Sequence, residues 1–123
     1  MNLKEKLKKI NVESDWIGLR EVREKNTYRV VRDMKPQANQ SNETHGIMVE
    51  VLSNGQFGYY GSNSTDLKSL QYAAEKALEQ AQIASKYSIH SFTKDARPKA
   101  VGTYLSSFKD NVNTMNAGEL NNL

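Results

Sequence analysis

The chain has 123 residues, no cysteine and a formal net charge of +3 at pH 7. A chain of this length can bury one hydrophobic core, so a single domain is expected. The lack of cysteine excludes disulfide bonds, thiolate metal ligands and a cysteine nucleophile. Hydrophobic residues make up 37% and charged residues 25%, as in an ordinary soluble protein.

No secretory signal or membrane span is predicted. Residues 1–10 are rich in lysine but are not followed by the apolar run that a signal peptide needs. No window approaches the roughly 20 apolar residues of a membrane helix. We therefore expect a cytoplasmic protein without membrane contact.

The excess positive charge is concentrated in residues 1–35. A nucleic-acid-binding domain usually carries a higher charge that is clustered on one face. Solvated faces of a helix and a strand explain this charge more simply, so nucleic acid is not an expected partner.

The first half of the chain predicts one short helix and two strands. Leu3, Leu7 and Ile10 recur at helical spacing with lysines between them, which predicts an amphipathic helix over residues 2–10. Residues 15–23 and 27–34 are typical of two strands, joined by a tight turn at residues 24–26. Residues 35–44 are mostly amide and hydroxyl side chains and predict a mobile surface loop.

A hairpin and a long helix follow. Residues 47–52 and the aromatic run 57–60 flank Asn54-Gly55, a pair that favours a type I′ turn because both residues tolerate positive φ. Residues 65–86 then change to helical periodicity, with Ser64 or Thr65 expected as the N-cap and Asp66 complementing the helix dipole. The expected apolar stripe is Leu67, Leu70, Ala74, Ala77, Leu78, Ala81 and Ala84.

These elements predict an α+β fold. It is a two-layer sandwich with a four-stranded, largely antiparallel sheet, a short N-terminal helix and a long helix after the fourth strand. We expect residues 1–95 to form the domain and residues 96–123 to be an extended tail or linker. The tail's scattered hydrophobic residues are Val101, Tyr104, Leu105, Phe108, Met115 and Leu120.

No catalytic, cofactor-binding or metal-binding residue is predicted. The only histidines, His45 and His90, are far apart in sequence and lack the spacing of a helical zinc motif. Residues 54–61 resemble the glycine-aromatic strand of RNA-recognition domains, which would place Tyr59 and Tyr60 against bases. The predicted strand order differs from that fold, so aromatic packing on the sheet, with Gly58 and Gly61 at close backbone approaches, is the preferred interpretation.

The order of these features resembles the N-terminal domain of the TldD/PmbA family, whose members are often described as modulators of DNA gyrase. The resemblance is carried by Leu19-Arg20-Glu21-Val22, by residues 46–52, by residues 54–59 and by the alanine-rich helix, and it spans residues 14–88. It extends weakly to residues 102–104 and 115–120, which look like the family's connection to its middle region. The resemblance therefore implies that residues 96–123 lead toward a missing middle and catalytic region. Glu50 stands where many members carry a basic residue, so substrate preference is not transferred.

The resemblance implies a zinc metallopeptidase in which two related subunits associate. The family's histidine, glutamate and cysteine ligands have no matching positions in this sequence, so zinc is implied only for the full-length family. The implied function is a non-catalytic domain that positions a peptide or protein substrate, or a partner subunit, with a link to gyrase through the family description alone. The alternative is a free-standing interaction module without enzymatic activity.

Overall fold

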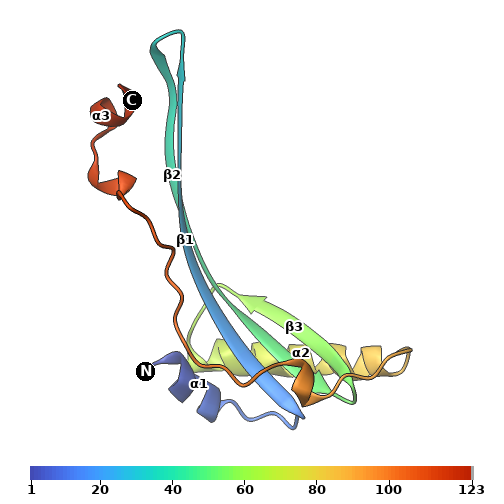
Figure 1. The fold of residues 1–123 in the computed structure, drawn as a ribbon. Coiled ribbons are helices and arrows are strands. Elements are labelled where there is room, and N and C mark those ends of the chain that lie inside the picture. The colour runs from blue at the N-terminus through green and yellow to red at the C-terminus, as the bar shows by residue number, and fades with distance from the viewer. Residues whose placement is uncertain (123) are drawn as a thin grey trace. The chain divides into compact units, whose positions relative to one another are not determined.

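The computed structural model describes residues 1–122 and contains an antiparallel sheet with helices (Figure 1). Its elements in chain order are α1 (Leu3–Lys9), β1 (Trp16–Arg32), β2 (Lys35–Ser53), β3 (Gln56–Ser62), α2 (Leu67–Ser85), the 3-10 turns η1 (Lys94–Ala96) and η2 (Val112–Thr114), and α3 (Ala117–Asn121). No helix of the described residues is long and apolar enough to cross a lipid bilayer.

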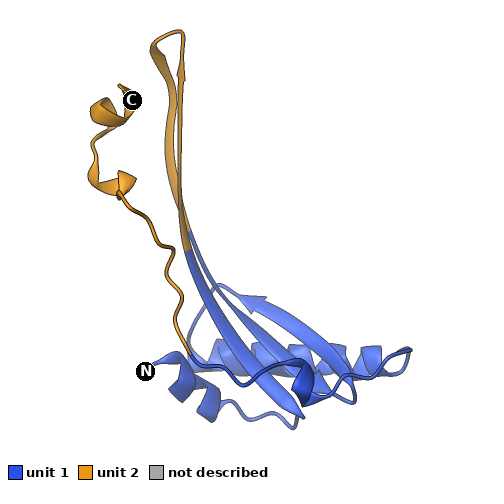
Figure 2. Cartoon of the chain, viewed as in Figure 1, with its two compact units in different colours: residues 1–23, 44–101 blue, residues 24–43, 102–123 orange. Residues whose placement is uncertain are grey.

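The chain divides into two compact units (Figure 2). Unit 1 contains Met1–Arg23 and Thr44–Val101. It therefore includes the pairing of β2 with β3 and all of α2. Unit 2 contains Glu24–Glu43 and the described residues from Gly102 onward. Among residues 1–122, all fully buried residues belong to unit 1, so the hydrophobic core lies there.

The sheet has three strands in the order β1-β2-β3, rather than the four strands predicted. β2 pairs antiparallel with β3 from Ile47 opposite Ser62 to Ser53 opposite Gln56. Asn54 and Gly55 form the connecting turn with φ values of 51° and 78°, which confirms the predicted positive-φ turn.

Two sequence predictions about the first hairpin are wrong. Residues 24–26 lie inside β1 instead of forming a turn, and residues 35–44 belong to β2 instead of forming a loop. The turn lies at Asp33 and Met34, whose φ values are 51° and 61°. The strands of unit 2 are mostly exposed, so they need no alternation of apolar and polar residues, and the sequence carries no periodic signal for them.

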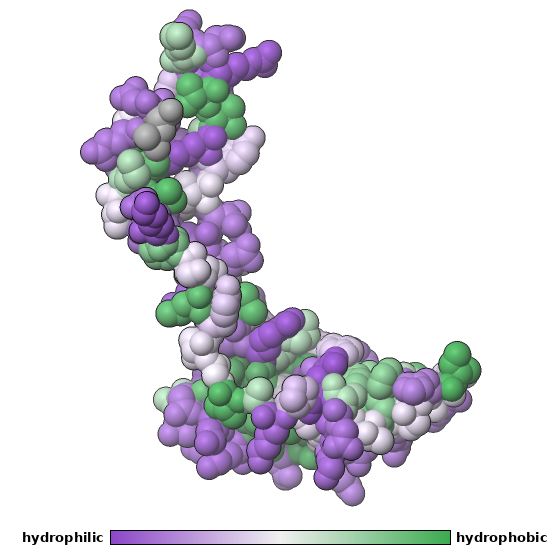
Figure 3. Space-filling model, in the orientation of Figure 1, coloured by the Kyte–Doolittle hydropathy of each residue, from purple (hydrophilic) through white to green (hydrophobic). Residues whose placement is uncertain are grey.

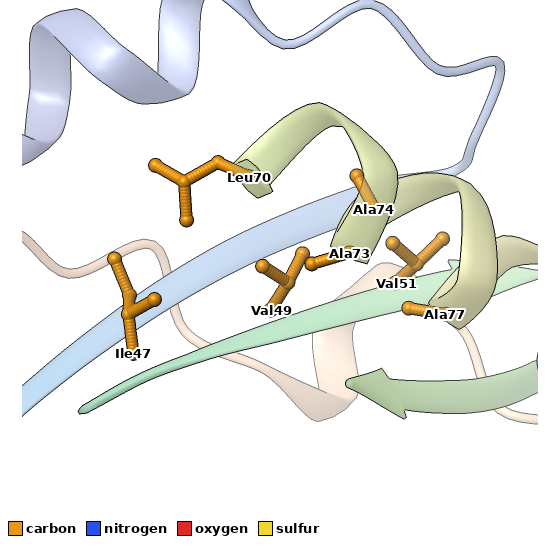
Figure 4. Close-up of a cluster of buried hydrophobic side chains, with 7 residues drawn as sticks. All are labelled: Ile47, Val49, Val51, Leu70, Ala73, Ala74 and Ala77. Carbon is orange, nitrogen blue, oxygen red and sulfur yellow. The ribbon is translucent and has the colours of Figure 1, made fainter. Parts of the chain in front are cut away.

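The core lies between the sheet and α2 (Figure 4). Side chains of β2 that face the helix alternate with side chains on the opposite face, as expected for a pleated strand. The predicted helical stripe is confirmed in the middle of α2, although Ala73 is buried in addition and Ala84 is exposed. The buried cluster contains Ile47, Val49, Val51, Leu70, Ala73, Ala74 and Ala77.

Both predicted helices of unit 1 are present, with local hydrogen bonds that explain where they begin. Asn2 and Glu5 form a reciprocal capping box at the start of α1. The N-cap of α2 is Asp66, not Ser64 or Thr65, because the Asp66 carboxylate accepts the Ser69 backbone N–H at 2.9 Å. The Asp66 carboxylate also accepts hydrogen bonds from the hydroxyls of Ser64 and Ser69. These bonds hold the pKa of the Asp66 carboxyl well below the ordinary value.

A glutamine side chain fastens the segment after α1 to α2. The Asn11 backbone N–H donates to Gln71 Oε1 at 2.8 Å, and Gln71 Nε2 donates to the Asn11 carbonyl at 2.8 Å. Leu3, Ile10 and Val12 pack against the core cluster at its margin. The segment before β1 is therefore held by both polar and apolar contacts.

Unit 2 has a different character. None of its described side chains is fully buried. The parts of β1 and β2 within residues 24–43 form a two-stranded ribbon. The Thr27 hydroxyl in this ribbon lies 3.4 Å from the Ser41 hydroxyl and 3.5 Å from the Asn113 side-chain oxygen, so the C-terminal segment contacts the ribbon. Within the predicted tail, Met115 and Leu120 are half-buried, whereas Tyr104, Leu105 and Phe108 are exposed.

Candidate binding surface

Among the described residues of unit 1, α1 and α2 pack on the core side of the sheet, whereas the segment that contains η1 contacts part of the opposite face (Figure 1). Because Ile47, Val49 and Val51 face the helix, the residues between them on β2 face the other way. The same alternation applies to β1 and β3. We call this surface the open face, and its residues are Trp16, Gly18, Arg20, Met48, Glu50, Phe57 and Tyr59.

The segment that follows α2 returns to one end of the open face. The Phe92 backbone N–H donates to the Gly55 carbonyl at 2.8 Å, and the Phe92 ring packs on the Phe57 ring at 5.5 Å between centroids. Gln56 Nε2 donates to the Ser88 hydroxyl at 2.7 Å. Residues 88–97 are therefore attached to β3 and its turn, and we call them the return segment.

Arg97 ends the return segment and contacts three residues of the open face. Its Nε and Nη2 atoms lie 3.0 and 2.8 Å from Glu50 Oε1, and Nη2 lies 3.4 Å from the Tyr59 hydroxyl. The guanidinium carbon lies 4.7 Å from the centroid of the Phe57 ring, a cation–π geometry. The Glu50 carboxylate raises the pKa of Arg97, while partial burial and then Glu50 raise the pKa of Tyr59.

A hollow of about 400 Å³ lies on the open face beside Arg97. Its lining combines aromatic, thioether, guanidinium and carboxylate groups: Trp16, Gly18, Leu19, Arg20, Met48, Glu50, Tyr59 and Arg97. On the side of unit 1 that Figure 3 shows, hydrophobic and hydrophilic side chains are mixed. A mixed lining of this kind suits a ligand that has both apolar and polar groups.

Gly18 shapes one wall of the hollow. A Cβ atom at position 18 would lie 2.4 Å from Cη2 of Trp16, so the indole extends across the glycine. The Trp16 ring also meets the Phe57 ring edge-on, with centroids 6.3 Å apart. Glycine at this position therefore allows the only tryptophan of the chain to lie along the hollow.

A second hollow, of about 660 Å³, lies at the start of α2. Its polar groups are engaged with one another: the Ser62 hydroxyl donates to the Ser64 carbonyl at 2.9 Å, and Asp66 accepts from Ser64 and Ser69. Because these groups satisfy each other, this hollow offers fewer free polar contacts than the open face.

The histidines considered from the sequence do not come together as metal ligands. His45 Nε2 lies 2.7 Å from Glu21 Oε1, and the His90 ring packs edge-on against Phe92 at 4.6 Å. Residues 1–122 contain no group of three or more His, Asp or Glu side chains that could hold a metal ion. The donor set of the described residues therefore does not fit the zinc ion implied by the resemblance.

Tyr59 and Tyr60 lie on opposite faces of β3. Tyr59 is on the open face, whereas Tyr60 packs against the core and meets the Tyr72 ring at 5.8 Å. The two rings therefore cannot form a single platform for stacking bases. The interpretation that these aromatic residues pack on the sheet agrees with this geometry.

Residues 18–81 match the family model of the PmbA/TldA metallopeptidase domain 1, which is just over half of the chain. The chain belongs to this family. No curated protein and no solved structure matches the chain. The match begins at Gly18 in β1 and ends at Ala81 in α2, and it includes Arg20, Glu50 and Tyr59 of the open face.

Three residues of this surface were not singled out from the sequence. Trp16 had a usable signal, because a lone tryptophan two residues before a glycine in a strand suggests a ring folded over that glycine. Phe92 and Arg97 had none, since Arg97 meets Glu50 across 47 positions of sequence from a segment without periodicity. Only the fold brings these groups together.

Proposed function

We propose that this chain is the non-catalytic first domain of a PmbA/TldA metallopeptidase, and that its open face positions peptide substrate for an active site outside these residues. The observation that carries the proposal is the hollow on the open face, which is lined in part by aromatic residues and is not covered by α2. The chain that presents this hollow belongs to a metallopeptidase family. In this proposal, the zinc ligands and the catalytic residues lie outside this chain.

The hollow has the groups that such a role needs. The Trp16 indole, the Met48 thioether and the Tyr59 ring supply apolar surface that adapts to different side chains. Glu50 is held in place by Arg97, so the lining is ordered before a peptide arrives. Preordered groups lose less conformational entropy on binding, which favours affinity.

Unit 2 is proposed to bind a related subunit. A two-stranded ribbon without a hydrophobic core is only marginally stable in water by itself. The described part of unit 2 has no fully buried side chain, and its exposed apolar residues include Tyr28, Met34, Tyr104, Leu105 and Phe108. A partner that covers these side chains would supply the core that the ribbon lacks.

Binding of unstructured peptides to the chain tests the substrate-positioning role. Trp16 is the only tryptophan, so peptides without tryptophan can be titrated while its fluorescence is followed. We expect a saturable change in emission, weakened by Tyr59→Ala, with the peptides still intact by mass spectrometry after incubation with zinc. Tyr87→Ala is the matched control, because Tyr87 is 82% exposed and follows the end of α2. An unchanged emission spectrum with every peptide would contradict the proposal.

A further inference from the structure

We propose that the hollow on the open face selects extended peptide segments in which a carboxylate and an apolar side chain are two residues apart and point to the same side. This inference rests on the proposed substrate-positioning function and specifies its substrate class. It follows from the balance of charges inside the hollow, from its apolar wall and from the spacing of side chains along an extended peptide.

The charged groups of the hollow do not cancel. Arg20 and Arg97 contribute two guanidinium groups, and Glu50 contributes one carboxylate. Glu50 is already paired, since its Oε1 atom lies 2.8 Å from Arg97 Nη2. Arg20 is exposed and forms no hydrogen bond or ion pair within residues 1–122. One guanidinium therefore stays available to an incoming anion.

A guanidinium favours a carboxylate over other partners. Its planar N–H donors match the two carboxylate oxygens, and such charge-assisted pairs are stronger than neutral hydrogen bonds. Trp16 and Met48 supply apolar groups to the lining of the same hollow, and lower solvation beside apolar groups strengthens the attraction between opposite charges. A neutral amide at the same place would form a weaker hydrogen bond with the guanidinium, and a lysine would be repelled by its positive charge.

The apolar wall adds a second requirement. The Trp16 indole, which Gly18 allows to lie across β1, forms a flat surface for an aliphatic or aromatic side chain. In an extended peptide, side chains at positions i and i+2 point the same way and are separated by roughly 7 Å, or two strand residues. A carboxylate and an apolar residue spaced i and i+2 can therefore enter the hollow together, whereas an i and i+1 pair points to opposite sides.

Fluorescence anisotropy of labelled peptides on the full chain tests this selection. Host peptides of serine and alanine, with amidated C-termini, carry Leu-Ser-Glu, Leu-Ser-Gln, Leu-Ser-Lys or Leu-Glu. A fifth peptide has leucine and a free C-terminal carboxylate but no acidic side chain, which distinguishes the two sources of carboxylate. We expect the Leu-Ser-Glu peptide to bind on the order of tenfold more tightly than the Leu-Ser-Gln peptide, the ratio that corresponds to one charge-assisted pair.

Variants assign this preference to Arg20. Arg20→Gln should reduce the ratio between the acidic and amide peptides to about one, and Arg20→Lys should restore part of it, because charge is kept but the fork geometry is lost. Arg32→Gln removes the same charge from an exposed position of β1 and should leave the ratio unchanged. Circular dichroism spectra that match the parent chain establish that each variant is folded.

The outcomes separate this inference from the proposed function. Equal binding of the acidic, amide and lysine peptides would overturn the carboxylate preference while leaving peptide binding in place. A preference that survives Arg20→Gln would also overturn it, because the carboxylate would then be recognised elsewhere. Failure of all five peptides to bind would count against the proposed function as well.

Discussion

Gly58 of β3 lies directly under the Ala77 carbonyl of α2, so that a Cβ atom at position 58 would be 1.8 Å from that oxygen. The helix backbone itself is the obstacle, with the Ala81 nitrogen at 2.9 Å from the same point. The glycines at positions 58 and 61 predicted close backbone approaches. The prediction is correct for Gly58 but wrong for Gly61, where the nearest atom is Met48 Cε at 3.8 Å.

This contact makes Gly58→Ala strongly destabilising. The added methyl group must push α2 away from the sheet, and overpacking of this kind reduces the free energy of unfolding by about 1–3 kcal/mol or more. Urea denaturation followed by circular dichroism measures the change. Gly61→Ala on the same strand is the matched control and should be close to neutral. Equal stability of the two variants would show that α2 does not lie as close to β3 as described.

The Asp66 cap gives α2 a defined pH dependence. Hydrogen bonds from Ser64 and then from Ser69 lower the folded-state pKa of Asp66 below the ordinary value of 3.8. A depressed pKa means that the ionised carboxylate stabilises the fold above pH 3.8, and that this contribution is lost as the pH falls further.

Asp66→Asn isolates this contribution, since the amide oxygen can still accept the Ser69 N–H but carries no charge. We expect the parent chain to be more stable than the variant at pH 7 and the difference to shrink as the pH falls below 3.8. Thermal unfolding of both proteins across this range measures the difference. A gap that stays constant with pH would mean that the charge of Asp66 has no role.

The turn of unit 2 carries backbone strain. Met34 has a φ of 61°, and a non-glycine residue in the left-handed region is strained by about 1–2 kcal/mol. Met34→Gly would create Asp-Gly, a preferred type I′ pair. Backbone amides of the ribbon next to the turn should then exchange with deuterium several times more slowly. Faster exchange in the variant would contradict the assignment of the turn to Asp33 and Met34.

The wall of the hollow is sensitive to Gly18. In Gly18→Ala the new methyl group would overlap the end of the Trp16 ring, so the indole must rotate off β1. Because the backbone of Gly18 does not have a positive φ, little change in stability is expected. Trp16 emission should shift to longer wavelength as the ring becomes more exposed, and peptide binding should weaken. An unchanged spectrum would show that the ring does not lie over Gly18.

The core could be predicted from the sequence because buried apolar residues recur with the period of a strand or a helix. Ile47, Val49 and Val51 alternate along β2, and Leu70, Ala74 and Ala77 recur at helical spacing, so the sheet, the hairpin and α2 were all expected. Asn54-Gly55 fixed the position of the second turn through its backbone preference. These signals are local and are set by the same physical forces that form the core.

The ribbon and the open face left no such record. The strands of unit 2 are exposed on both sides, so polar residues 35–44 were mistaken for a loop and the Asp33-Met34 turn was missed. The hollow depends on pairings between distant segments, above all Arg97 with Glu50. Neither residue type nor spacing predicts an ion pair between residues so distant in sequence, and only the folded backbone brings the two side chains together.

Peptide binding to the open face can be mapped residue by residue with nuclear magnetic resonance. An unlabelled peptide containing Leu-Ser-Glu is added to the ¹⁵N-labelled chain, and amide shifts are followed across residues 1–122. We expect saturable shifts centred on Trp16, Arg20, Glu50 and Tyr59, with little change along the exposed side of α2. Shifts that cluster on α2, or no shifts at a saturating peptide concentration, would show that the open face is not the peptide-binding surface.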